Sequence, residues 1–137
     1  MDTTTVGDQR LTLAPQALVE AFYAAALPGD WDAVVPLLHP DFAVTESAAL
    51  PFAGTYHGLD GLRQLGGAIY AHCSRFEVTP MAYTTGPDRV VVQLHVAGAT
   101  RVSQRPFTSE ILELFLLESG QIREIRPFYW DPSALAQ

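Results

Sequence analysis

The sequence of 137 residues contains no lysine and only one cysteine, Cys73. A single thiol excludes an internal disulfide and any metal site built from several cysteines. No apolar run approaches the roughly 20 residues that a membrane-spanning helix requires. Residues 1–10 are polar and lack the basic and then apolar pattern of a secretory signal, so we expect a flexible N-terminus and a cytoplasmic protein.

Positive charge is scarce as well. Eight arginines oppose 15 acidic residues, which gives a formal net charge of −7. Binding to nucleic acid or to an anionic membrane requires clustered cations. We therefore expect neither of these partners.

Sequence motifs for metals and phosphates are also missing. No two histidines stand three or four residues apart on one predicted helix, and there is no glycine-rich phosphate loop or Gly-x-Ser-x-Gly elbow. The histidines are His39, His57, His72 and His95. We expect neither a metal nor another cofactor.

The apolar content suits one domain. Hydrophobic residues make up 48% of the chain and charged residues 17%. A chain of this length buries roughly 68% of its unfolded surface, so it needs no disulfide to fold. We expect a single domain over residues 11–137.

Three segments of the N-terminal half have apolar side chains at helical spacing: residues 14–27, 31–38 and 59–73. Pro15 suits the first helical position, and Gly29 follows the expected end of the first helix. Asp30 can cap the second helix. Pro36 should kink or shorten that helix because proline lacks a backbone N–H.

The remaining segments predict strands, at residues 42–46, 76–84, 89–102, 107–117 and 121–130, with a short hairpin near 54–56. Pro80 requires an edge strand or a bulge. Consecutive hairpins are antiparallel, and long strands curl. Helices early and strands late predict an α+β fold. We expect a curved antiparallel sheet wrapped around the three helices, with an apolar pocket inside.

Seven short segments follow one another over nearly the whole chain. They read Phe-Tyr-Ala-Ala-Ala (22–26), Gly-Asp-Trp-Asp (29–32), Leu-Leu-His-Pro-Asp-Phe (37–42), Gly-Thr-Tyr-His-Gly (54–58), Glu-Leu-Phe (113–115), Gly-Gln-Ile (120–122) and Ile-Arg-Pro-Phe-Tyr-Trp-Asp (125–131). Their order resembles the nuclear-transport-factor-2-like superfamily, in particular its SnoaL-like polyketide cyclases and ketosteroid isomerases. The resemblance implies a cone-shaped, cystatin-like α+β roll. Such a fold carries several activities and also non-enzymes.

Two glutamates are the candidate catalytic residues. By similarity to the ketosteroid isomerases, Glu46 is the general base and Glu113 is a protonated acid that donates to the substrate oxygen. Apolar surroundings raise the pKa of a carboxyl group, which suits both roles. The alternatives are a solvated Glu46 and an ion pair between Glu113 and Arg126. Glu110 lies on the opposite face of its strand unless a bulge intervenes.

Aromatic side chains are the expected pocket walls: Phe22, Tyr23, Phe52, Tyr56, Phe128 and Trp130. The position of the isomerases' oxyanion tyrosine is Phe22 here, which has no hydroxyl. Tyr23 points about 100° further around the helix. The hydroxyl could come instead from another tyrosine: Tyr56, Tyr70, Tyr83 or Tyr129.

The resemblance and the two glutamates predict a cofactor-independent acid–base enzyme, an isomerase or a cyclase. Its substrate would be a hydrophobic carbonyl compound such as a polyketide or a steroid-like molecule. Asp131 and Arg126 resemble part of the Asp-Arg-Asp set of limonene-type epoxide hydrolases, but nothing around Glu113 completes that set. The other alternative is a non-catalytic protein of the same fold that binds a small ligand or assembles with partners.

One strand also predicts an assembly. Its apolar residues alternate on one face: Leu112, Leu114 and Leu116. If the other face lines the pocket, this row needs a cover, and a second subunit is the usual one. We expect a homodimer.

Overall fold

The computed structural model describes residues 13–136 and begins with two helices. Helix α2 (Pro15–Ala26) starts at a proline and buries one apolar face. The chain then turns at Gly29, whose φ of 82° lies in the left-handed region that glycine adopts without strain. The Asp30 side chain accepts a hydrogen bond from the backbone N–H of Ala33 and caps the short helix α3 (Trp31–Val34).

Proline shortens the second predicted helix. Helix α3 ends at Val34 and continues only as the 3-10 helix η1 (Val35–Leu37), which contains Pro36. Strand β1 (Leu38–Glu46) begins directly afterwards. The predicted effect of Pro36 is confirmed: the helix is shortened because proline has no backbone N–H to donate an α-helical hydrogen bond.

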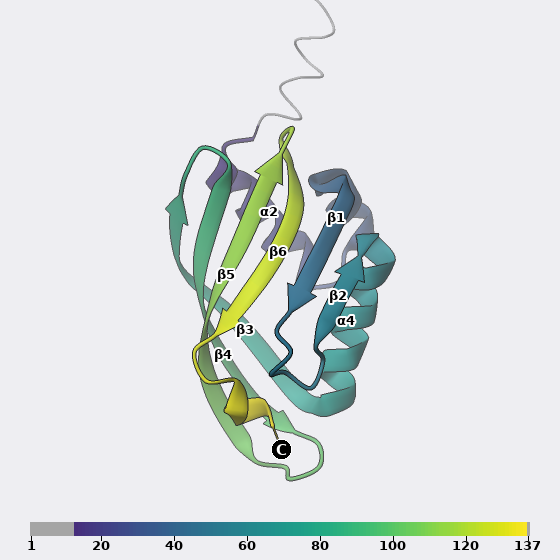
Figure 1. Cartoon of the computed structure of the whole chain (residues 1–137), viewed down its shortest axis with the longest axis vertical. Coiled ribbons are helices and arrows are strands. Elements are labelled where there is room, and N and C mark those ends of the chain that lie inside the picture. Colours follow the sequence, from purple (N-terminus) through teal and green to yellow (C-terminus); the bar gives the residue numbers. More distant parts are fainter. Residues whose placement is uncertain (1–12, 137) are drawn as a thin grey trace, which may run out of the picture.

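A hairpin and a long helix complete the N-terminal half. Strand β2 (Gly54–His57) pairs antiparallel with β1, and helix α4 (Gly58–His72) follows it. Gly61 brings α4 close to β2, since a Cβ atom at this position would lie 2.5 Å from the carbonyl carbon of Tyr56. The helix therefore packs against the end of the sheet that β1 and β2 form (Figure 1).

Four strands form most of the sheet: β3 (Cys73–Thr85), β4 (Arg89–Thr100), β5 (Pro106–Glu118) and β6 (Gln121–Tyr129). The spatial order is β2-β1-β6-β5-β4-β3. Strand β3 is an edge strand, and its register shifts between Pro80 and Ala82. Pro80 therefore lies on an edge strand and also beside a bulge, the two alternatives that the sequence predicted. A 3-10 helix, η2 (Pro132–Leu135), ends the described chain.

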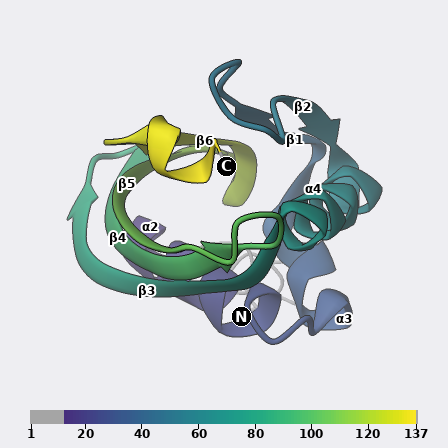
Figure 2. The ribbon, with the colours of Figure 1, turned by 90° about the horizontal axis from the view of Figure 1, so that it is seen from below.

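The α+β architecture with a curved sheet is confirmed, but the sheet is mixed rather than wholly antiparallel. Strands β1 and β6 pair in parallel, while the other neighbours are antiparallel. No hairpin joins β1 to β6, because α4 and four strands separate them in the sequence. Strands β3, β4 and β5 curve in an arc that turns back toward α4 (Figure 2).

The core lies on the inner side of this curve. Alternate residues of β4 are buried: Val90, Val92, Leu94 and Val96. Helices α2 and α4 cover part of the same side. None of the helices within residues 13–136 is long and apolar enough to cross a membrane. The segment predicted to be flexible, residues 1–10, lies outside the described residues.

Candidate functional site

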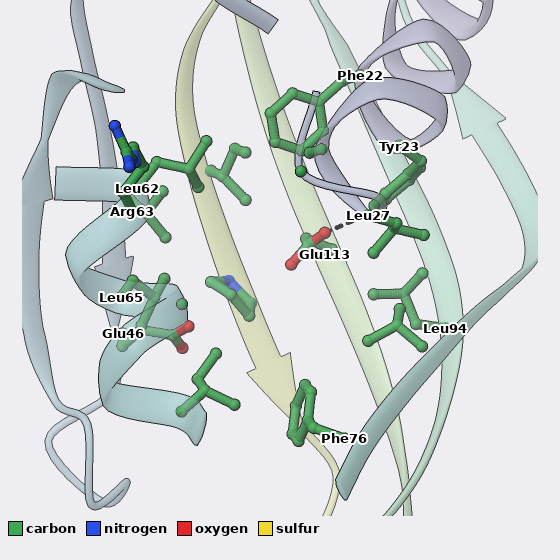
Figure 3. Close-up of a pocket in the computed structure, with 18 of the residues that line it drawn as sticks. Phe22, Tyr23, Leu27, Glu46, Leu62, Arg63, Leu65, Phe76, Leu94 and Glu113 are labelled. Atoms are coloured by element: carbon green, nitrogen blue, oxygen red, sulfur yellow. Dashed lines mark hydrogen bonds between the residues drawn. The ribbon is translucent and has the colours of Figure 1, made fainter. Parts of the chain in front are cut away.

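A cavity of about 480 Å³ opens between α2, α4 and the inner face of the sheet. Its walls are mainly aliphatic and aromatic, from Phe22, Leu62, Leu65, Phe76, Leu94 and Ile125 among others. Two carboxyl groups, those of Glu46 and Glu113, project into this apolar space (Figure 3). The pocket expected from the sequence is therefore present, and both candidate glutamates line it.

Glu46 is the last residue of β1 and is 5% exposed. The alternation of the strand turns Phe42, Val44 and Glu46 inward together. Its Oε1 atom is buried and has no hydrogen-bond partner among residues 13–136. Burial, and secondly the charge of Glu113, raises the pKa of Glu46 to about 8. The alternative of a solvated Glu46 does not hold.

Glu113 lies in the middle of β5, between the inward-facing Ile111 and Phe115. The Tyr23 hydroxyl donates a hydrogen bond of 2.6 Å to its Oε1 atom. Burial raises the pKa of Glu113 to about 7, and the bond from Tyr23 opposes this rise. The alternative pairing with Arg126 does not occur, since Arg126 forms its ion pair with Glu124.

Tyr23 and Phe22 both line the cavity, although they follow one another on α2. Their rings pack edge-to-face against Phe115 at centroid distances of 5.6 and 5.7 Å. The cavity extends far enough around α2 to receive both side chains. Burial and the charge of Glu113 raise the pKa of Tyr23, so the phenol keeps its proton and acts as a donor. Tyr23 therefore supplies a hydroxyl where the sequence alone left four other tyrosines open.

Tyr129 adds a second phenol to the lining. Burial and then the charges of Glu46 and Glu113 raise the pKa of Tyr129. Arg63 and Trp31 also line the cavity, and the sequence analysis did not identify them. Arg63 directly follows the apolar Leu62 on α4, and this position beside the apolar stripe of the helix is the one signal that could have identified it.

Four of the predicted wall residues lie outside the cavity lining. Phe52 is buried and packs against Tyr129, with ring centroids 6.4 Å apart. The Tyr56 hydroxyl donates to the Phe52 carbonyl oxygen at 2.9 Å. Phe128 and Trp130 are 56% and 86% exposed. Because strand residues alternate between faces, the inward position of Tyr129 turns both of its neighbours outward.

Glu110 takes the position expected of it, on the face opposite Glu113. It accepts a hydrogen bond from the side-chain amide of Gln93 at 2.9 Å and pairs with His95 at 3.2 Å. Asp131 caps η2 by accepting a bond from the Ser133 backbone N–H. Within residues 13–136, no three His, Cys, Asp or Glu side chains gather as metal ligands would. The chemistry available from the cavity residues themselves is proton transfer and hydrogen bonding.

The comparisons with solved structures agree with this architecture. A nuclear-transport-factor-2-like protein of Burkholderia thailandensis is 22% identical, with a TM-score of 0.78 over 92% of this chain and 97% of that one. A Catenulispora acidiphila protein with a ketosteroid isomerase-like fold, solved with trimethylamine, is 20% identical, with a TM-score of 0.71 over 88% and 90%. A Jannaschia protein named for the SnoaL-like polyketide cyclases is 20% identical, with a TM-score of 0.74 over 89% of each chain.

No curated protein matches the chain in sequence. The structural similarities, at these low identities, establish the fold. The SnoaL-like domain family, however, matches residues 19–125, which include most of α2, the first five strands and the positions of both buried glutamates. The chain belongs to the SnoaL-like domain family.

Proposed function

We propose that the protein is a cofactor-independent acid–base enzyme, an isomerase or a cyclase, that acts on a hydrophobic carbonyl compound. One observation carries the proposal: two carboxyl groups and the phenol of Tyr23 meet in a mainly apolar cavity. Glu46 and Glu113 both have raised pKa values there, and Tyr23 bonds to Glu113. Perturbed carboxyl groups in a concave apolar site are typical of acid–base catalysis.

The pair of glutamates holds one proton near neutral pH, because two charges in one apolar cavity are unfavourable. In the empty site the proton resides on Glu46, whose Oε1 atom has no partner. Glu113 is the ionised member, since the Tyr23 hydroxyl stabilises its charge. A substrate carbonyl oxygen that accepts the Tyr23 hydroxyl removes this donor. The proton then moves to Glu113, and Glu46 becomes the base.

The proposed reaction begins at the carbon next to the substrate carbonyl. Glu46 takes the proton as the C–H bond breaks, and the electron pair forms the enolate, whose oxygen accepts bonds from Tyr23 and Glu113. Return of the proton to a different carbon gives an isomer. Attack of the enolate carbon on a second carbonyl closes a ring, and the new alkoxide takes the proton. Both outcomes leave the protein groups unchanged.

Hydrogen exchange tests the first step without knowledge of the natural substrate. The probe is 2-tetralone in D2O, a bicyclic ketone with acidic protons beside its carbonyl, followed by proton NMR. We expect the wild-type protein to accelerate exchange and Glu46→Gln to reduce the accelerated rate by about a thousandfold, since the general base is lost. Glu110→Gln is the matched control and should retain the wild-type rate.

Two results would contradict the proposal: no acceleration by the wild-type protein, or equal acceleration by Glu46→Gln. Binding of the ketone without exchange would favour the alternative of a non-catalytic ligand-binding protein. Circular dichroism of each variant establishes that it is folded, so loss of exchange reports chemistry.

We also propose that the chain forms a homodimer through the outer face of the sheet. Three large apolar side chains are exposed there: Leu112, Phe128 and Trp130. Leu112 and Phe128 are directly paired across β5 and β6, so they form one continuous patch. Exposed apolar patches of this kind usually mark an interface, and a twofold interface would cover the same patch on both copies.

Light scattering after gel filtration tests the dimer. We expect about twice the chain mass of 14.9 kDa for the wild-type protein and the chain mass for Leu112→Asp. Val102→Asp is the control, because Val102 is exposed in the β4–β5 turn, away from this patch. A wild-type monomer, or a dimer that persists in Leu112→Asp, would contradict this interface.

A further inference from the structure

The mouth of the cavity lies between the end of α2 and the outer side of α4. The lining residues that are exposed gather there, namely Leu27, Pro28, Gly29, Arg63, Gly67 and Tyr70. The buried lining residues, among them Glu46, Val44 and Leu94, lie deeper. Figure 3 shows Arg63 on α4 across the cavity from Leu27 and Tyr23 of α2.

Two consecutive glycines keep this mouth open. Gly66 and Gly67 lie in the interior of α4, where glycine destabilises a helix relative to alanine. Neither glycine is required by packing, since a Cβ atom at either position would meet nothing within 4 Å. Both line the cavity. Their missing side chains leave room for a ligand to pass beside Arg63.

Among the described residues that line the cavity, Arg63 is the one cation. No carboxylate of residues 13–136 forms an ion pair with it. Its guanidinium carbon lies 6.0 Å from the ring centroid of Trp31, a cation–π distance that orients the side chain at the mouth. The guanidinium therefore retains its hydrogen-bond donors for a ligand, in a chain whose net charge of −7 otherwise repels anions.

We propose that Arg63 selects ligands that carry an anionic group, a carboxylate or an acidic enol, at the end opposite the reacting carbonyl. The ligand's apolar body would fill the cavity, its carbonyl would meet Tyr23 and Glu113, and its anionic end would remain at the mouth. Arginine suits this task because its planar fork binds a carboxylate through two parallel hydrogen bonds. The inference rests on the proposed function in taking the cavity as the substrate site, but it requires no turnover.

Calorimetric binding of two matched probes tests the selection. The probes are 6-hydroxy-2-naphthoate and its methyl ester, which have the same ring system and phenol but differ in charge. We expect the wild-type protein to bind the acid at least tenfold more tightly than the ester. Arg63→Met should abolish this preference and change ester binding by less than twofold, whereas Arg63→Lys should retain most of it.

Arg105→Met is the matched control, since it removes the same charge from the exposed β4–β5 turn and should keep the preference. Raising NaCl from 50 to 500 mM should reduce the preference in the wild-type protein and have no such effect in Arg63→Met. Equal affinity for the two probes, no binding of either, or a preference that survives in Arg63→Met would overturn the inference. A preference that depends on Arg63 in a protein that fails to exchange 2-tetralone would uphold the inference and reject the catalysis.

Discussion

Glu110 and Glu113 lie three residues apart on β5, and their surroundings are opposite. Glu110 faces outward, where bonds from Gln93 and then His95 lower its pKa. Glu113 faces the cavity, where burial raises its pKa to about 7. The same side chain on the same strand is thus more easily ionised on the outer face and less easily ionised on the inner face.

The difference arises from what each face offers to a charge. The outer face has an amide, an imidazole and water, which solvate a carboxylate. The inner face has aromatic and aliphatic side chains, and the phenol of Tyr23 donates to Glu113 there. An ionised group that has lost its hydration gains basicity, which is useful only where a substrate can reach it. The two faces of the sheet therefore shift the pKa of a glutamate in opposite directions.

The largest expected difference between the two glutamates is in activity. Glu113→Gln should reduce the rate of 2-tetralone exchange by up to about 10², since an amide is a weaker donor to the developing oxyanion than a carboxylic acid. Glu110→Gln should change this rate by less than twofold. Exchange rates measured by NMR at one pH decide the matter, and similar losses in both variants would contradict the division between the faces.

The pH dependence of exchange sharpens the comparison. The active state of the free protein has one proton on the pair, so kcat/KM should fall on both sides of a narrow optimum between about pH 7 and 8. Below this range both carboxyl groups are protonated and no base remains. Above it both are ionised and the acid is lost.

Removal of Glu113 should change the shape of this pH profile. In Glu113→Gln the alkaline decline due to the pair should disappear. The acidic limb should persist near its wild-type position, because Glu113 is uncharged in the doubly protonated pair and does not raise the pKa of Glu46 there. Glu110→Gln should keep both limbs. A profile that stays bell-shaped with unchanged limbs in Glu113→Gln would contradict the shared proton.

The free energy of unfolding should also change, with opposite signs for Glu46→Gln on the inner face and Glu110→Gln on the outer face. Glu46 has a folded-state pKa of about 8, above its ordinary value of 4.5. The unfolded chain therefore binds fewer protons between these values, and the free energy of unfolding falls as pH rises through this interval. Glu46→Gln should remove this loss and raise the free energy of unfolding at pH 8 by about 4 kcal/mol, with little difference at pH 4.5.

Glu110→Gln should instead lower stability slightly at pH 8, because the folded state favours the ionised form of Glu110. Urea unfolding at the two pH values measures both effects. A Glu46→Gln variant that is less stable than the wild-type protein at pH 8 would show that the carboxylate has stabilising partners in the fold.

Local patterns in the sequence determined much of the architecture. Apolar spacing located α2 and α4, Pro36 shortened the second helix, and Pro80 marked an irregular edge strand. These features depend on neighbouring residues and on backbone chemistry, so a linear reading suffices for them. The alternation of β5 likewise separated Glu110 from Glu113.

The parallel pairing of β1 with β6 and the composition of the cavity were decided by tertiary structure alone. Phe128 and Trp130 resembled pocket walls in the sequence, yet the register of β6 placed them outside. The Tyr23–Glu113 bond joins residues 90 positions apart, and the contact of Arg63 with Trp31 joins two helices. Such contacts depend on how strongly the sheet curls and where the helices rest against it. The curvature depends on packing throughout the chain, so no local sequence pattern encodes it.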